Sequence, residues 1–72
     1  MNPLFKEYDV VKLITNIDSP CVPAGTIGTV LMVFNSDISS YEVEFVDSNG
    51  EHIALCTVSE RDLKIASEDE LP

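Results

Sequence analysis

Residues 41–46 read Tyr-Glu-Val-Glu-Phe-Val, the most regular alternation of apolar and acidic side chains in this chain of 72 residues. Successive side chains of a β-strand point to opposite faces of the sheet. One face of this segment is therefore apolar, while Glu42 and Glu44 share the other. The pattern predicts an antiparallel strand with one face on a core and one face in solvent.

A hairpin signal follows this segment directly. Residues 47–50 read Asp-Ser-Asn-Gly, and an Asn-Gly pair between two strand-like runs favours a type I′ turn, in which both central residues have positive φ. We therefore expect residues 51–58 to form the partner strand, with Asn49 and Gly50 at the turn.

Two more strands are predicted on the N-terminal side. Residues 8–14 and 26–34 are rich in β-branched and other apolar residues, as strands are. The stretch between them is rich in proline, glycine and polar residues and predicts a long ordered loop. Gly25 and Gly28 would give the backbone the freedom to turn sharply into the second strand.

The C-terminal part predicts one short helical turn, a last strand and a tail. Ser59 can act as the N-cap of the helical turn, residues 63–65 can add a strand, and residues 66–72 form a flexible acidic tail. The expected fold is all-β, a small SH3-like antiparallel barrel of about five strands over residues 1–65. Its predicted core consists of Val10, Leu13, Val30, Met32, Tyr41, Val43, Phe45, Leu55 and Leu63.

Residues 23–34, Pro-Ala-Gly-Thr-Ile-Gly-Thr-Val-Leu-Met-Val-Phe, followed by Tyr-Glu-Val-Glu-Phe at 41–45, carry a family resemblance. They resemble the glycine-turn-strand signature of SH3-like small barrels, including KOW-type modules. Over residues 4–65 the chain is similar to a family of small bacterial proteins known as a domain of unknown function. Such acidic domains are often encoded beside toxin-like or nuclease-like partners, so the resemblance implies an antitoxin or immunity role.

The charge balance bears on the class of partner. The chain has 13 Asp and Glu against 4 Lys and Arg, a formal net charge of −9, whereas modules that bind nucleic acid are usually basic. Glu42, Glu44 and Glu51 would form an acidic face that docks a basic protein. The alternative is that strand alternation alone produces an ordinary solvated face.

Residues 30–34 are apolar on both sides of their strand. Strict alternation would put Val30, Met32 and Phe34 on one face and Leu31 and Val33 on the other. Either the bent sheet and the loop at 17–22 cover this second pair, or Leu31 and Val33 belong to a contact patch for a second copy or another protein.

No set of residues indicates an enzyme or a cofactor. Cys21 and Cys56 are the only cysteines and His52 the only histidine, which is too few ligands for a structural zinc site. Two unlinked thiols are expected, and a Cys21–Cys56 disulfide in an oxidising compartment is the alternative. Gly25-x-x-Gly28 lacks the following lysine of a phosphate-binding loop. Residues 1–7 lack the features of a secretory signal and no apolar run could span a membrane, so a cytoplasmic location is expected.

The sequence therefore predicts a non-catalytic, acidic protein-binding module, with no cofactor, metal or membrane partner. An antitoxin or immunity-type inhibitor of a basic protein is the most specific form of this prediction. A structural adaptor subunit of a larger complex is the alternative, with a KOW-like nucleic-acid-associated module behind it. Self-association through the apolar patch also stays open.

Overall fold

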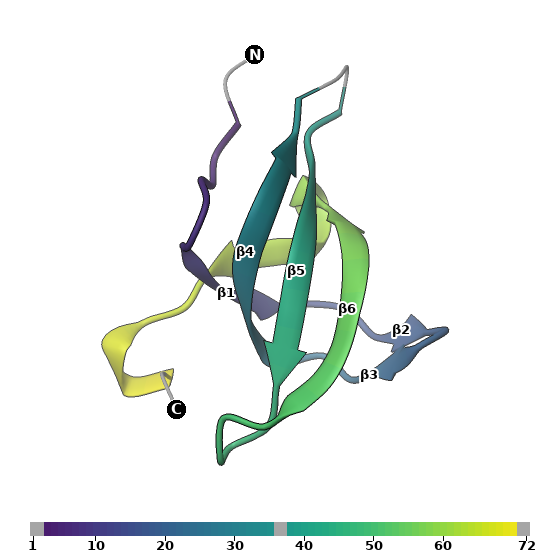
Figure 1. Ribbon diagram of the computed structural model, residues 1–72, viewed down its shortest axis with the longest axis vertical. Helices are drawn as coiled ribbons and strands as arrows, with labels where there is room; N and C mark the ends of the chain where they lie inside the picture. The colour runs from purple at the N-terminus through teal and green to yellow at the C-terminus, as the bar shows by residue number, and fades with distance from the viewer. Residues whose placement is uncertain (1–2, 36–37, 71–72) are drawn as a thin grey trace.

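The computed structural model describes residues 3–35 and 38–70. These residues form seven strands and two 3₁₀-helical turns (Figure 1). In chain order the elements are β1 (Val10–Leu13), β2 (Ile17–Asp18), β3 (Cys21–Val22), β4 (Ile27–Phe34), β5 (Ser40–Val46), β6 (His52–Ser59), η1 (Glu60–Asp62), β7 (Leu63–Ile65) and η2 (Glu68–Glu70).

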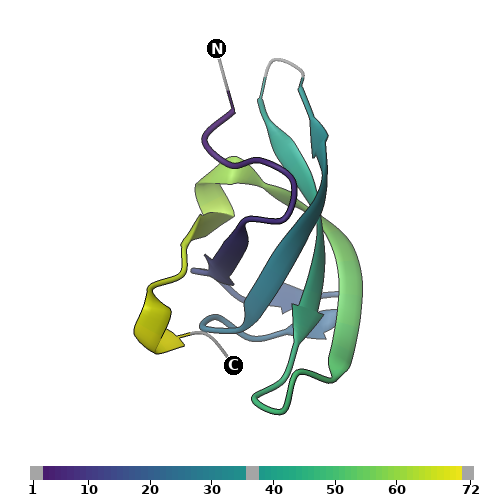
Figure 2. The same cartoon turned by 60° about the vertical axis from the view of Figure 1, so that its left-hand side comes forward.

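Five of the strands form one antiparallel sheet in the order β6-β5-β4-β1-β7, and β2 pairs with β3 in a separate small hairpin. The three long strands, β4, β5 and β6, follow one another as a meander. The chain then makes the η1 turn and returns so that β7 pairs with β1. Figure 2 shows how strongly this sheet bends. The all-β fold, its five principal strands and the single helical turn before the last strand are confirmed.

Strand β5 has the alternation that its sequence predicts. Its odd-numbered side chains, Tyr41, Val43 and Phe45, are fully buried, whereas Glu42 and Glu44 are only partly covered. Most of the core lies between this side of the sheet and the elements that fold over it. The buried apolar residues are Phe5, Val11, Leu13, Val22, Val30, Tyr41, Val43, Phe45, Ala54, Val58 and Leu63.

A β-bulge in β4 changes which of its side chains face the core. The register places Val30 opposite Val43 but Met32 opposite Glu42, so Leu31 is the additional residue. After the bulge, Val33 lies opposite the buried Tyr41 and packs against the core. The predicted alternation is therefore wrong beyond Val30.

Three residues of the predicted core lie elsewhere. Met32 and Leu55 lie opposite Glu42 and Glu44 respectively, and residues paired across strands point to the same face. Both are therefore exposed on the side of the sheet away from the core. Val10 is only half-buried.

The N-terminal segment, residues 3–9, supplies a core residue that no strand pattern indicates. Phe5 is buried and its ring packs edge-on against Tyr41, with ring centroids 5.2 Å apart. The chain reaches β1 through a turn in which Asp9 N–H donates to Lys6 O, and Tyr8 has a φ of 72°. This left-handed residue explains why β1 begins at Val10 rather than at residue 8.

Side-chain hydrogen bonds hold the N-terminal segment in place. The Tyr41 hydroxyl accepts from Phe5 N–H at 3.2 Å and donates to Glu60 Oε2. The same carboxylate oxygen accepts from Leu4 N–H at 2.9 Å. Burial and the hydrogen bond to Glu60 raise the pKa of Tyr41, while the bonds from Leu4 and Tyr41 lower the pKa of Glu60.

The turn between β5 and β6 differs from the predicted type I′ turn. Gly50 has positive φ but Asn49 does not. Gly50 N–H donates to Asp47 O, Asp47 N–H donates to Glu51 O, and Asp47 Oδ1 accepts from Asn49 N–H and Glu51 N–H. This is the geometry of a three-residue hairpin loop that ends in a left-handed glycine. The side chain of Asp47 favours it because its oxygen satisfies two backbone donors of the turn.

The loop before β4 contains the small β2–β3 hairpin, whose Val22 is buried in the core. Gly25, with a φ of 95°, makes the sharp turn into β4 as predicted. Gly28 does not, because it lies inside β4 opposite Phe45. A Cβ there would lie 2.9 Å from Glu44 O, so this position needs glycine for space rather than for conformational freedom.

The predicted helical turn after β6 is present, but Ser59 makes no side-chain capping hydrogen bond. Instead, Glu60 N–H donates to Ser39 O and Leu63 N–H closes the turn on Glu60 O. In the predicted tail, Ala66 N–H donates to Val10 O at 3.1 Å before η2. The end of that tail, residues 71–72, lies outside the described residues, as do residues 36–37 of the predicted polar connection.

Candidate functional site

The strongest candidate site is the outer face of the β4–β5–β6 meander, the face opposite the core. We define it by Met32, Phe34, Glu42, Glu44, Leu55 and Thr57, which the strand registers place on the same side of the sheet. Met32 and Leu55 each expose 51% of their surface and Phe34 exposes 37%. The outer face thus presents two carboxylates between exposed apolar side chains.

The two carboxylates of the outer face make weak local contacts. Glu44 Oε2 lies 3.0 Å from His52 Nδ1, and Glu42 Oε2 accepts from the Thr57 hydroxyl at 3.4 Å. Both contacts are exposed, and contacts of this kind contribute about 0–1 kcal/mol each. A cationic side chain of a partner could therefore replace these contacts of Glu42 and Glu44 at a small cost in free energy.

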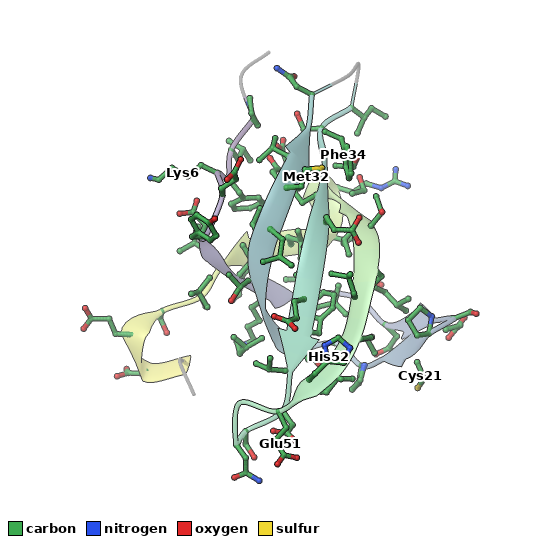
Figure 3. The ribbon with its side chains drawn as sticks, viewed as in Figure 1. Lys6, Cys21, Met32, Phe34, Glu51 and His52 are labelled. Atoms are coloured by element: carbon green, nitrogen blue, oxygen red, sulfur yellow. The ribbon has the colours of Figure 1, made fainter. Side chains whose placement is uncertain are left out.

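Glu51 is not part of the outer face. It lies in the loop that joins β5 to β6, at the tip of the hairpin (Figure 3), where its backbone N–H donates to Asp47 Oδ1 at 3.0 Å. The predicted acidic trio is therefore one pair on the sheet, Glu42 and Glu44, and a separate carboxylate at the end of the hairpin.

The predicted apolar pair is divided in a similar way. Leu31 is 39% exposed at the bulge, whereas Val33 is partly buried and packs against the core. The exposed positions are taken by Met32, which was predicted to lie in the core, and by Phe34, which was predicted to lie on the same face as Met32 (Figure 3). Sequence alternation could not have found them, because a bulge reverses the phase without leaving a mark in the pattern of apolar residues.

Cations are segregated from this face. The stretch from residue 13 to residue 60 contains no Lys or Arg, although it contains seven Asp and Glu. Lys6 lies in the N-terminal segment, Arg61 in η1, and Lys12 and Lys64 lie opposite each other on β1 and β7. The strands of the outer face therefore carry Glu42 and Glu44 but no Lys or Arg.

The two thiols lie in different surroundings. Both cysteines are free, with Cys21 exposed on β3 and Cys56 half-buried. Burial first, and then the charge of Glu42, raise the pKa of Cys56, so its thiol is less often a thiolate and a weaker nucleophile. Among residues 3–35 and 38–70 no group of three or more potential metal ligands comes together.

In the part of the chain that the structure describes, no helix has the length and apolar character needed to cross a bilayer.

Comparisons with known proteins identify a family but no activity. No curated protein and no solved structure matches the chain. The sequence pattern of one family, described as Domain of unknown function (DUF4926), matches residues 7–65. That range includes every strand of the sheet and both carboxylates of the outer face. The chain therefore belongs to the DUF4926 family.

Proposed function

We propose that this domain is a non-catalytic, acidic protein-binding module with an SH3-like fold, and that it docks a basic protein on its outer face. The observation that carries the proposal is the combination on that face of Glu42 and Glu44 with the exposed Met32, Phe34 and Leu55, on strands without a cation. Carboxylates steer and orient a cationic partner, while the apolar side chains bury area against it.

An antitoxin or immunity-type inhibitor is the most specific form of this proposal. A nuclease-like or toxin-like enzyme that acts on nucleic acid has a cationic cleft, because it must hold a phosphate backbone. Glu42 and Glu44 would take the place of that backbone, and the domain would inhibit by covering the cleft. Such a role fits a cytoplasmic bacterial protein of net charge −9.

The test is affinity capture from native cell extract with three forms of the tagged domain. The wild type is compared with Glu42→Lys/Glu44→Lys and with Glu68→Lys/Asp69→Lys, which makes the same change of charge on η2. We expect a basic partner that is captured by the wild type and by the η2 variant, lost with the sheet variant, and released at high salt because screening weakens exposed charge pairs. Capture that is unchanged by Glu42→Lys/Glu44→Lys, or by salt, contradicts the proposal.

A structural adaptor is the second candidate, and the exposed Met32, Phe34 and Leu55 favour it. A permanent interface is more apolar than a transient one, so this function predicts a partner that survives high salt and is lost with Leu55→Lys. Nucleic-acid binding is disfavoured by the charge, and a gel-shift assay with RNA and DNA at low salt tests it.

A further inference from the structure

Strand β4 is an interior strand that is open along its second half. It pairs with β5 over its whole length, but its pairing with β1 covers only Ile27, Gly28 and Thr29. Val30 adds two backbone hydrogen bonds on that side, to Asp9 O at 2.9 Å and from Tyr8 N–H at 2.7 Å. Beyond Val30, no backbone group of residues 3–35 and 38–70 pairs with β4 on this side, and Figures 1 and 2 show no strand there.

The fold itself leaves this edge open. The left-handed φ of Tyr8 turns the chain away from β4, and the hydrogen bonds of Leu4 and Phe5 to Glu60 and Tyr41 then hold it elsewhere. The N-terminal segment therefore cannot extend β1 alongside residues 31–34 without losing these anchors and withdrawing Phe5 from the core.

The bulge determines which backbone groups point outward at the open edge. Successive residues of a strand direct their N–H and C=O alternately to the two neighbouring strands. Val30 directs both groups away from β5, towards Tyr8 and Asp9. Because the bulge inserts one residue, the next position of β4 with this orientation is Val33. Its N–H and C=O are the groups that an added strand would use.

The surroundings of the open edge favour a cationic occupant. Exposed apolar side chains of Leu31, Met32 and Phe34 flank Val33. Glu42 lies opposite Met32 on β5, and the exposed Glu7 immediately precedes the residue that bonds to Val30. A second copy of this chain, also of net charge −9, would bring like charges together here.

We propose that residues 31–34 of β4 accept an extended, lysine- or arginine-bearing segment of a partner protein as an additional strand. Main-chain hydrogen bonds to Val33 would give part of the affinity, and alternate side chains of the added strand would lie beside Met32 and Phe34. This inference rests on the proposed function, because it specifies how the basic partner is held.

The test is an NMR titration of the full chain with the capped peptide Lys-Thr-Lys-Val-Lys-Thr-Lys at low salt. We expect shifts of the backbone amides of residues 31–34, and slower hydrogen exchange at Val33. The same peptide with proline in place of valine should not bind there, since proline removes a donor and disfavours strand pairing.

Two matched variants locate the contact. Met32→Lys places a like charge beside the peptide and should weaken binding by about tenfold or more. Ile65→Lys makes the same change at a residue of similar exposure on β7, a strand that pairs with β1 and not with β4, and this variant should bind as the wild type does. Circular dichroism confirms that both variants fold.

Three results contradict the strand addition. The first is no response of the Val33 amide, and the second is equal binding of the proline peptide. The third is a dimer of the free chain in sedimentation that Met32→Lys dissociates. The proposed function fails separately, when Glu42→Lys/Glu44→Lys leaves partner capture unchanged. A partner that depends on Glu42 and Glu44, together with a Val33 amide that does not respond, removes only the strand addition.

Discussion

Of the three glycines, Gly28 has the least space for a side chain. A Cβ built there would lie 2.5 Å from Val43 Cγ1 and 2.9 Å from both Glu44 O and Phe45 Cδ1. One of these atoms belongs to the backbone of β5, so a side-chain rotation cannot relieve the contact. We expect Gly28→Ala to lower the free energy of unfolding by about 3 kcal/mol, the upper end of the usual cost of overpacking.

Gly25→Ala is the control for Gly28→Ala. No atom lies within 4 Å of a Cβ at Gly25, so the cost there comes only from its positive φ and should be about 1–2 kcal/mol. Denaturant unfolding measures both values. A larger loss for Gly25→Ala than for Gly28→Ala would mean that β5 moves to accommodate the methyl group.

Glu60 should make stability depend on pH in the acid range. The hydrogen bonds from Leu4 N–H and the Tyr41 hydroxyl lower the pKa of this carboxyl in the folded state. The stabilisation is complete above the carboxyl pKa of the unfolded chain, about 4.3, and is lost as the pH falls below it towards the folded-state pKa. Glu60→Gln should therefore reduce the slope of stability against pH below about pH 5.

Thermal unfolding between neutral and acid pH measures this slope. Glu51→Gln removes the same charge from the tip of the hairpin and controls for the change of net charge. An unchanged slope in Glu60→Gln would show that the contacts of Leu4 and Tyr41 do not discriminate between the two protonation states.

The N-terminal segment, residues 3–9, contributes to the core although it forms no strand. Phe5 is buried against Tyr41, whereas the neighbouring Leu4 is exposed. Phe5→Ala should lower the free energy of unfolding by about 3–5 kcal/mol. Leu4→Ala, which leaves the backbone bond to Glu60 intact, should change it by less than about 0.5 kcal/mol.

Denaturant unfolding of the two variants compares these costs directly. Equal, small losses would mean that the segment folds back without contributing to stability, and the hydrogen bonds of Tyr41 and Glu60 would then need another explanation.

The elements that the sequence predicts best are those whose pattern is local. The alternation at 41–46 specifies β5 and the orientation of Glu42 and Glu44, because nothing interrupts that strand. Phe5 and Val22 are single apolar residues outside any long strand, and only the folded chain brings them into the core. The bulge at Leu31 could not be predicted either, because residues 30–34 are all apolar and their pattern does not mark a change of phase.

The net charge of −9 should lower the stability of the folded domain. Seven acidic residues and no Lys or Arg lie between residues 13 and 60, so folding concentrates like charges that repel one another. Added NaCl screens this repulsion over about 10 Å at 0.1 M and should raise the melting temperature. Because about 1 kcal/mol corresponds to about 4–8 °C in a domain of this size, a rise of a few degrees is expected.

Neutralising the outer face separates binding from stability. Glu42→Gln/Glu44→Gln keeps hydrogen-bond acceptors for Thr57 and His52 but removes two charges, so it should melt higher than the wild type at low salt and gain less from NaCl. A gain of stability together with lost partner capture would mean that these carboxylates bind the partner and lower the stability of the folded domain. A lower melting temperature at low salt would instead show that the contacts to Thr57 and His52 outweigh the repulsion.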